Sequence, residues 1–523
     1  MPTIVTRVVM PTALAAAIVL VLLTSALGEA TQAPATPKRA AAKAKVAKPK
    51  PPRKPHVVLL IMDELPSDSL LDRRGTIDPV RYPNFAALAA DSTWFRNAYS
   101  IFDSTSKAVP LILDGNWPRW GLTPDRSGHP RSIFDMFRRR GYRMVASEEA
   151  SALCPRRMCR GGRAQVPHIP PLLNRGRPAR FNRWVRTIRD GRPTFWMKHL
   201  LLPHVPYMYL PSGARTRPGA RDPLPGMTTV PGFHDEYLTR HNEQRYLLQL
   251  GYTDRLLGRL LRRLEREGIY DETLVVVVAD HGYLWRSGVQ TRRRALADTA
   301  HELSPVPLIV KRPVQRRGRV SDAFARTLDV PSTIADVLGV RLGYRDDGRS
   351  AFSRAARRIR RVTFPTREFD AVVTISGKRW LAQRRRVVRR RLRQFGAGDL
   401  GRLYTGIGPN RELIGRNVVG AARAGSLSGR VVGARQYANV RHSSGLMPTQ
   451  ITGRLTDGSG RLRDLAVAVN GRIAAVGRSF RLTNSPGEHF AFMVPEETLG
   501  EGHNTVEVFE VVGGGSLRLV ARG

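Results

Sequence analysis

Apolar runs alternate with amphipathic stretches along the chain from His56 to about residue 365. Apolar residues recur at helical spacing over 84–90, 132–139 and 246–267. Five short apolar runs have the length of buried strands: 57–62, 143–147, 195–202, 274–278 and 306–310. This alternation is typical of an α/β domain whose mostly parallel sheet is covered by helices on both faces. We therefore predict one such domain over residues 56–365.

The pattern changes after residue 365. An arginine-rich run at 384–393 and a Gly/Arg-rich joint at about 420–445 come first. The later segment LAVAVNGRIAAVG has period-two alternation on both sides of Asn470-Gly471, which predicts a β-hairpin with a two-residue turn. We predict a basic extension over 366–440 that completes or follows the α/β domain, and a small antiparallel β domain over 441–523.

The N-terminal segment indicates export. Residues 8–23 are apolar apart from Thr12, and the small residues Ser25, Ala26 and Gly28 follow. The run is shorter than the roughly 20 residues of a spanning helix, which favours a signal peptide over a membrane anchor for residues 1–30. Basic residues at 38–45 would hold the body of an uncleaved anchor in the cytoplasm, but cleavage removes that conflict. We expect an extracytoplasmic protein, secreted or anchored to the cell membrane.

Residues 31–55 consist mostly of Ala, Lys and Pro and predict a solvated linker, because they cannot bury enough apolar surface to fold. The whole chain has 86 Lys and Arg against 43 Asp and Glu, a formal net charge of +43. This excess favours anionic partners such as an anionic lipid, a wall polymer, nucleic acid or a phosphorylated substrate. We find no motif for base recognition, so we expect no specific nucleic acid partner.

Two cysteines are too few for a disulfide framework or an all-cysteine zinc site. Cys154 and Cys159 lie in LCPRRMC, where a proline and two arginines interrupt any core pattern. Outside the cytoplasm this pair could form a small-loop disulfide.

Two predicted strands end in acid-bearing turns. VVLLIM leads into Asp63-Glu64, and LVVVVA leads into Asp280-His281. Ligands of open α/β sheets bind beyond the carboxyl ends of the strands, so both turns could face one crevice. Carboxylates with one imidazole suit a hard divalent metal ion, although each turn alone could be an ordinary polar strand end.

A helix is predicted to begin near Ser104-Thr105-Ser106, before the apolar run that leads to Gly115. A hydroxyl at a helix start is ordinarily a cap. The free amides and positive dipole at that end also suit a phosphate group, and a hydroxyl that touches a metal ionises more readily and can act as a nucleophile.

Taken together, these segments resemble the sulfatase-like branch of the alkaline phosphatase superfamily. The match spans residues 56–350 in the family's order, over HVVLLIMDELPSDSL, YPNFAALAADSTWFRNAYS, STSKAVPLILDG, FWMKHLLLPHVPY, QLGYTDRLLGRLLRRLEREGIYDETLVVVVADHG, HELSPVPLIV and TLDVPSTIADVLGV. The resemblance implies an alkaline-phosphatase-like fold. It also implies one divalent metal ion, Ca, Mn, Mg or Zn, held by Asp63, Glu64, Asp280 and His281.

The same resemblance places the family's nucleophile at Thr105, ten positions before Gly115, and in contact with the metal. Sulfatases use a Cys or Ser that matures to formylglycine within C/S-x-P-x-R, whereas this chain reads TSKAV from Thr105. An unmodified threonine is similar to the phosphoethanolamine and phosphoglycerol transferases and the nucleotide phosphodiesterases, which pass through a phosphothreonine.

Further residues are implied at the substrate. His204 in LLLPHVPY matches the family histidine that contacts the transferred anion or assists the leaving group, with a core histidine as the alternative. His301, Lys107 and His199 are expected near the substrate.

We therefore predict a monomeric, metal-dependent hydrolase or transferase of the sulfatase family that acts on phospho- or sulfo-esters through Thr105. Two alternatives stay open. One is a formylglycine-independent sulfuric ester hydrolase. The other is a catalytically degenerate protein that binds polyanions at the cell envelope, a function that the arginine run at 384–393 would support.

Overall fold

The computed structural model describes residues 54–164, 172–173, 175–219, 221–224, 226–227, 234–289, 291–418, 422–424, 426–456, 461–482 and 485–523. The predicted signal peptide or anchor at 1–30 and nearly all of the predicted linker at 31–55 lie outside these residues. Everything described belongs to one unit, Lys50–Gly523. No helix in the described ranges has both the length and the apolarity that a bilayer crossing requires.

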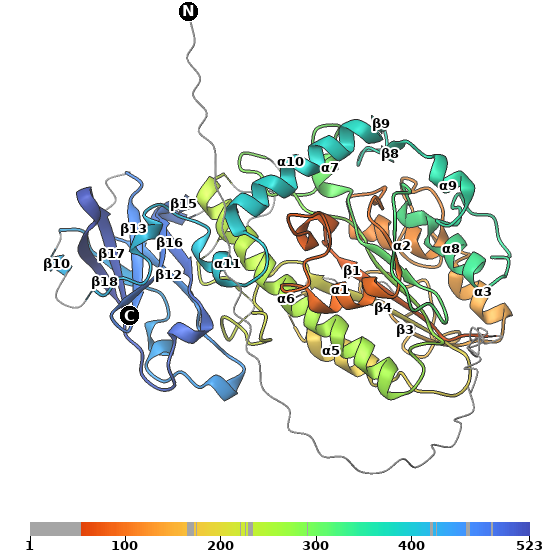
Figure 1. The fold of residues 1–523 in the computed structure, drawn as a ribbon, viewed down its shortest axis with the longest axis horizontal. Helices are drawn as coiled ribbons and strands as arrows, with labels where there is room; N and C mark the ends of the chain where they lie inside the picture. Colours follow the sequence, from red (N-terminus) through yellow and green to blue (C-terminus); the bar gives the residue numbers. More distant parts are fainter. Residues whose placement is uncertain are drawn as a thin grey trace, which may run out of the picture. The chain divides into compact units, whose positions relative to one another are not determined.

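A seven-stranded sheet forms the centre of the α/β region (Figure 1). Its order is β3 (Arg143–Ser147), β4 (Thr194–Pro203), β1 (Val57–Asp63), β5 (Leu274–Ala279), β6 (Leu308–Lys311), β2 (Thr93–Phe95) and β7 (Arg319–Ser321). Only β6 is antiparallel to its neighbours among these strands, so the other six end at the same edge of the sheet. The predicted mostly parallel sheet is confirmed, and all five predicted strands are present, with β6 beginning two residues later than expected.

Helices cover both faces of this sheet because the side chains of the central strand alternate between two hydrophobic cores. Val58 and Leu60 pack into one core, and Val57 and Leu59 pack into the other. The first core also takes in α1 (Pro83–Ala90), α5 (Arg177–Val185) and α6 (Glu236–Arg266). The second takes in α2 (Thr105–Asp114), α3 (Ile133–Arg139) and α8 (Val330–Val337) (Figure 1).

The segment after the sheet is an extension of hairpin and helix. It contains α9 (Arg354–Arg358), the hairpin of β8 (Arg361–Pro365) and β9 (Val372–Ser376), α10 (Gly377–Phe395) and α11 (Gly401–Thr405), whereas the short α7 (Ala300–Leu303) lies between β5 and β6. The arginine-rich run at 384–393 lies within α10. One face of α10 is buried through Trp380 and Arg384, and the other carries exposed arginines.

Two small sheets, mostly antiparallel, complete the C-terminal part. The first has the order β10 (Ala422–Ala424), β18 (Ser516–Arg522), β17 (Val506–Val512), β13 (Asp464–Val469) and β14 (Arg472–Arg478). The second has the order β11 (Gly429–Val431), β12 (Gln450–Leu455), β16 (Ser485–Met493) and β15 (Phe480–Leu482). Asn470 (φ 51°) and Gly471 (φ 76°) join β13 to β14, which confirms the predicted hairpin turn.

Cys154 and Cys159 form a disulfide with their Cα atoms 5.9 Å apart. Both cysteines are buried, while Arg156 and Arg157 between them are exposed. The small-loop disulfide that the spacing allowed is therefore present.

Candidate active site

The site lies where β1 and β5 end side by side. These neighbouring strands are parallel, so Asp63-Glu64 and Asp280-His281 leave the sheet at the same edge. The Asp280 Oδ1 atom accepts hydrogen bonds from the backbone N–H of Glu64 (3.0 Å) and of His281 (2.7 Å). One carboxylate oxygen thus ties the two turns together and leaves the other, Oδ2, free for a ligand.

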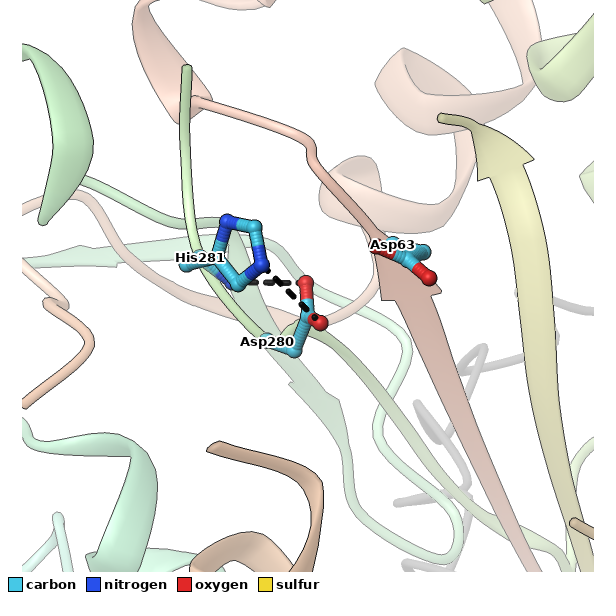
Figure 2. A group of neighbouring side chains, drawn as sticks. All are labelled: Asp63, Asp280 and His281. Atoms are coloured by element: carbon cyan, nitrogen blue, oxygen red, sulfur yellow. Dashed lines mark hydrogen bonds and ion pairs between the residues drawn. The ribbon is translucent and has the colours of Figure 1, made fainter. Parts of the chain in front are cut away.

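Asp63, Asp280 and His281 each offer a ligand atom, and these atoms lie within 4.8 Å of one another (Figure 2). All three side chains are buried. Asp280 Oδ2 has no hydrogen-bond partner among the described residues. His281 Nδ1 donates to the Gly282 carbonyl (2.9 Å), which leaves the Nε2 lone pair available.

This donor set fits a divalent cation. Burial, together with the charges of Asp280 and Glu64, raises the pKa of Asp63 well above its usual range. Burial also raises the pKa of Asp280 to about 7 and lowers the pKa of His281 to about 3. Two buried carboxylates beside a neutral imidazole are an unfavourable group by themselves, and a bound cation removes that penalty.

Thr105 is the first residue of α2, and its hydroxyl points into this cluster. The Oγ1 atom lies 3.2 Å from His281 Nε2 and 3.5 Å from Asp63 Oδ1. Neither Ser104, the residue before the helix, nor any other described side chain caps this helix start with a hydrogen bond. The Thr105 side chain is therefore available for chemistry, next to the free amides and positive end of α2.

The carboxylate of Glu64 lies against cationic side chains. Its Oε1 atom is 3.3 Å from Arg292 Nη2, 3.5 Å from Arg293 Nε and 3.4 Å from His204 Nε2. Arg292 is buried, with its guanidinium 5.6 Å from the centre of the Tyr283 ring, whereas the Arg293 side chain is 24% exposed. The structure thus places two arginines at the site that were not predicted from the sequence.

Two of the predicted histidines lie at the cluster. His204 Nδ1 donates to the Val205 carbonyl (2.6 Å), so Nε2 faces Glu64. Burial, with Arg292 and Arg293 nearby, holds the pKa of His204 well below its usual range. His199 Nε2 lies 3.6 Å from Asp63 Oδ2, and burial lowers the pKa of His199 to about 3.

The other two predicted substrate residues contact different groups. Lys107 Nζ donates to the Leu122 carbonyl (2.5 Å). His301 Nε2 lies 3.9 Å from Glu302 Oε1 and 3.4 Å from an Arg286 guanidinium nitrogen. Their roles at the substrate stay predictions.

Comparison with known proteins gives a family match and distant structural likenesses. Residues 178–340, which include His204, Asp280 and His281, match the family model described as Sulfatase. Comparison with curated protein sequences finds no match. The matched segment runs from α5 through β4, α6, β5, α7, β6 and β7 to α8.

Among solved structures, the chain is similar to a phosphonate monoester hydrolase of Agrobacterium radiobacter (16% identity, 60% of this chain and 80% of that chain, TM-score 0.44). It is also similar to a phosphonate monoester hydrolase from Silicibacter pomeroyi (21% identity, 57% of this chain and 76% of that chain, TM-score 0.40). A third similar structure is that of a 2-O GAG sulfatase (15% identity, 63% of this chain and 87% of that chain, TM-score 0.45). Because these TM-scores are below 0.5, the family match rests on residues 178–340 alone.

Proposed function

We propose that this chain, whose residues 178–340 match the Sulfatase family model, is a member of the sulfatase-like branch that transfers a phosphoryl or sulfuryl group from an ester to Thr105 and then to water or an acceptor alcohol. The observation that carries the proposal is the position of Thr105 Oγ1, 3.2 Å from His281 Nε2 and 3.5 Å from Asp63 Oδ1. A hydroxyl needed only for capping would point back to its own helix.

Asp63, Asp280 and His281 would hold one divalent metal ion, with Glu64 beside them. When bound, such an ion polarises the ester and makes a neighbouring hydroxyl easier to ionise. The chain's own residues supply the rest. Thr105 Oγ1 donates its hydrogen bond to Asp63 Oδ1, which gives the proton an acceptor and turns a lone pair of Oγ1 toward the ester.

Arg293 would bind the anionic oxygens of the ester. Arg293 is partly exposed, so its guanidinium can meet an incoming substrate, while buried Arg292 holds Glu64. As Thr105 Oγ1 forms its bond to phosphorus or sulfur, the bond to the ester oxygen breaks, and the helix-end amides of α2 stabilise the negative oxygens.

His204 would donate a proton to the leaving alcohol. Its Nε2 atom is neutral in the free protein, because burial and the two arginines depress its pKa. An anionic ester paired with Arg293 offsets this positive charge and lets Nε2 take up a proton. In the second step the same atom would accept the proton of the attacking water or alcohol.

The threonine favours phosphoesters over sulfate esters as substrates. Sulfatases of this family need a formylglycine, and residues 105–109 of this chain, TSKAV, do not carry that maturation motif. A formylglycine-independent sulfatase is the second candidate, and it would use the same residues.

The test compares the turnover of three 4-nitrophenyl esters: the phosphate monoester, a phosphodiester and the sulfate ester. The enzymes are the wild type, Thr105→Ala and the control Ser104→Ala, each supplied with Ca, Mn, Mg or Zn. We expect phosphoester turnover that falls by about a thousandfold or more in Thr105→Ala and by at most a few fold in Ser104→Ala. A clear preference for the sulfate would select the second candidate. Full activity of Thr105→Ala would contradict both.

An extracytoplasmic location, secreted or anchored, is part of the proposal. The N-terminal apolar run and the Cys154–Cys159 disulfide support it, since such bonds persist in oxidising compartments. Cell fractionation with N-terminal sequencing tests it, and a reduced protein found only in the cytoplasm would contradict it.

A further inference from the structure

A basic groove lies beside the N-terminal half of α10, apart from the residues of the candidate active site. Its main hollow has a volume of about 1200 Å³. Among the described residues, eight basic side chains and one acidic side chain, Asp322, line it. An acidic ligand is therefore the expected occupant on charge alone.

Several of these cations are free to bind a ligand. Asp322 is already paired with Arg96 (Oδ1 to Nε, 2.5 Å), so that pair is neutral. Arg319, Arg361, Lys378 and Arg385 are all exposed. No described acidic side chain forms an ion pair with any of these four residues.

The floor of the groove is apolar and recessed. Phe95, Phe324 and Ala351 line it and are buried, and Phe352 lies under the guanidinium of Arg312 (5.3 Å). A carbon surface below a rim of cations suits a ligand whose carbon rings alternate with anionic groups. It does not suit a membrane, because a bilayer is engaged by protruding apolar side chains, and Val320 is the one large apolar side chain of this described lining that is strongly exposed.

The groove continues along α10. A second hollow of about 450 Å³ shares Arg96, Asn97, Asp322, Leu381 and Arg385 with the first. Among the charged residues that it adds, Arg73, Arg74, Arg384 and Arg389 outnumber Asp68 and Asp72. The residues of α10 that line the two hollows extend from Gly377 to Leu392, so the hollows follow the length of this helix. The helix runs from the β8–β9 hairpin to α11 (Figure 1). An extended polymer fits this arrangement better than a single small anion.

Topology brings the groove and the candidate site to the same edge of the sheet. Arg96 follows β2 and Asp322 follows β7, and both strands are parallel to β1, which ends at Asp63, and to β5, which ends just before Asp280. Arg384 of α10 also donates to Asp68 (Nε to Oδ1, 3.0 Å), in the turn that follows Glu64. A polymer in the groove would therefore extend along the edge that holds the site.

The geometry points to an extended anionic glycan as the ligand of this groove. Its sulfate or phosphate groups would pair with Arg319, Arg361, Lys378 and Arg385, and its sugar rings would cover the apolar floor. This binding does not depend on Thr105 chemistry.

The experiment measures binding of a fluorescent, size-defined heparin fragment to the full chain by anisotropy. The groove variant is Arg361→Glu/Lys378→Glu/Arg385→Glu. The control is Arg379→Glu/Arg386→Glu/Arg393→Glu, which changes the charge equally at exposed positions of α10 outside the lining of both hollows. We expect at least about tenfold weaker binding for the groove variant, a change of less than about threefold for the control, and a steep loss of affinity with salt.

Thermal unfolding of both variants checks that they fold, and turnover of a small 4-nitrophenyl ester should be unchanged in both. Equal losses of affinity in the two variants, or no loss in either, would overturn the proposal that this groove is the binding site. Tighter binding to phosphatidylserine vesicles or to oligo(dT), lost in the groove variant, would overturn the glycan as its occupant. If no ester is turned over at all, the proposed function fails while the binding comparison still decides the groove.

Discussion

Single residues of this site could be predicted from the sequence only in part. Asp63, Asp280 and His281 follow apolar strands, so their approach to one another follows from the parallel sheet. Arg292 and Arg293 lie in the run TRRRAL, which has no periodicity and looks like any solvated basic loop. Their contact with Glu64 depends on how the loop after β5 folds back, and the sequence carries no local signal for that.

Arg293 should determine substrate affinity. Replacing it with alanine removes a guanidinium beside Glu64 and should raise KM for an anionic ester by about tenfold, with a smaller change in kcat. The matched control is Arg294→Ala, because Arg294 is adjacent and pairs with Glu368 (3.2 Å) at the surface. Steady-state kinetics of both variants measures this, and equal KM values for the two would argue against a substrate contact.

His204 should matter most for poor leaving groups. In His204→Ala, kcat for an alkyl ester should fall by about 10² or more, while the 4-nitrophenyl ester, whose leaving group needs little protonation, should lose much less. A plot of rate against leaving-group pKa for the wild type and the variant gives this comparison. The same loss for all esters would mean that His204 has a structural role only.

At the scale of elements, strands were predicted more accurately than the long helix. Helix α6 begins at Glu236, where Asp235 accepts from the Leu238 N–H (2.7 Å), well before the predicted start at residue 246. The first turns of α6 are buried through polar residues. Gln244, for example, donates to the Leu403 carbonyl (2.5 Å), so the apolar spacing that marks a helix is missing there.

A buried ion group joins β4 to the elements beside it. Lys198 of β4 and Arg180 of α5 both contact Glu149, and the Lys198 and Glu149 side chains are almost fully buried. Glu149→Gln should lower the free energy of unfolding by about 3–5 kcal/mol at neutral pH, because it leaves buried cations unpaired. Urea unfolding measures this. As a control, Asp271→Asn at the exposed Arg316 pair should cost at most about 1 kcal/mol.

The same pair predicts a pH dependence. Burial would raise the pKa of Glu149, but Lys198 and Arg180 outweigh burial and hold it at about 2. The unfolded-state pKa is about 4.3, so the stabilisation is complete above that pH and is lost as the pH falls toward 2. The stability difference between wild type and Glu149→Gln should therefore shrink between pH 5 and pH 3, and a constant difference would contradict this assignment.

At the scale of the whole molecule, the C-terminal sheets share a core with the α/β region. Tyr237 of α6 donates to the Ala491 carbonyl of β16 (2.9 Å), and Leu238 and Phe492 belong to the same hydrophobic core. The hairpin at Asn470-Gly471 was predictable from local turn chemistry. This packing against α6 was not, because it joins segments far apart in the chain.

Gly477 tests that packing. A Cβ atom on this residue would lie 2.1 Å from the Tyr237 hydroxyl and 2.9 Å from the Phe492 ring, so Gly477→Ala should destabilise the protein by about 1–3 kcal/mol. The control Gly513→Ala has open space around the added carbon and should change stability by less than about 0.5 kcal/mol. Thermal unfolding distinguishes them, and equal melting temperatures would mean that the two parts pack loosely.

The central claim, that Thr105 Oγ1 becomes covalently bonded to the transferred group, is tested most directly by acid-quenching the enzyme during turnover of a phosphodiester and mapping its peptides by mass spectrometry. We expect a phosphoryl-containing group on Thr105 of the wild type, and none on the neighbouring Ser104 or Ser106, nor on this peptide of Thr105→Ala. A covalent group on another residue, or turnover by Thr105→Ala at the wild-type rate, would contradict it.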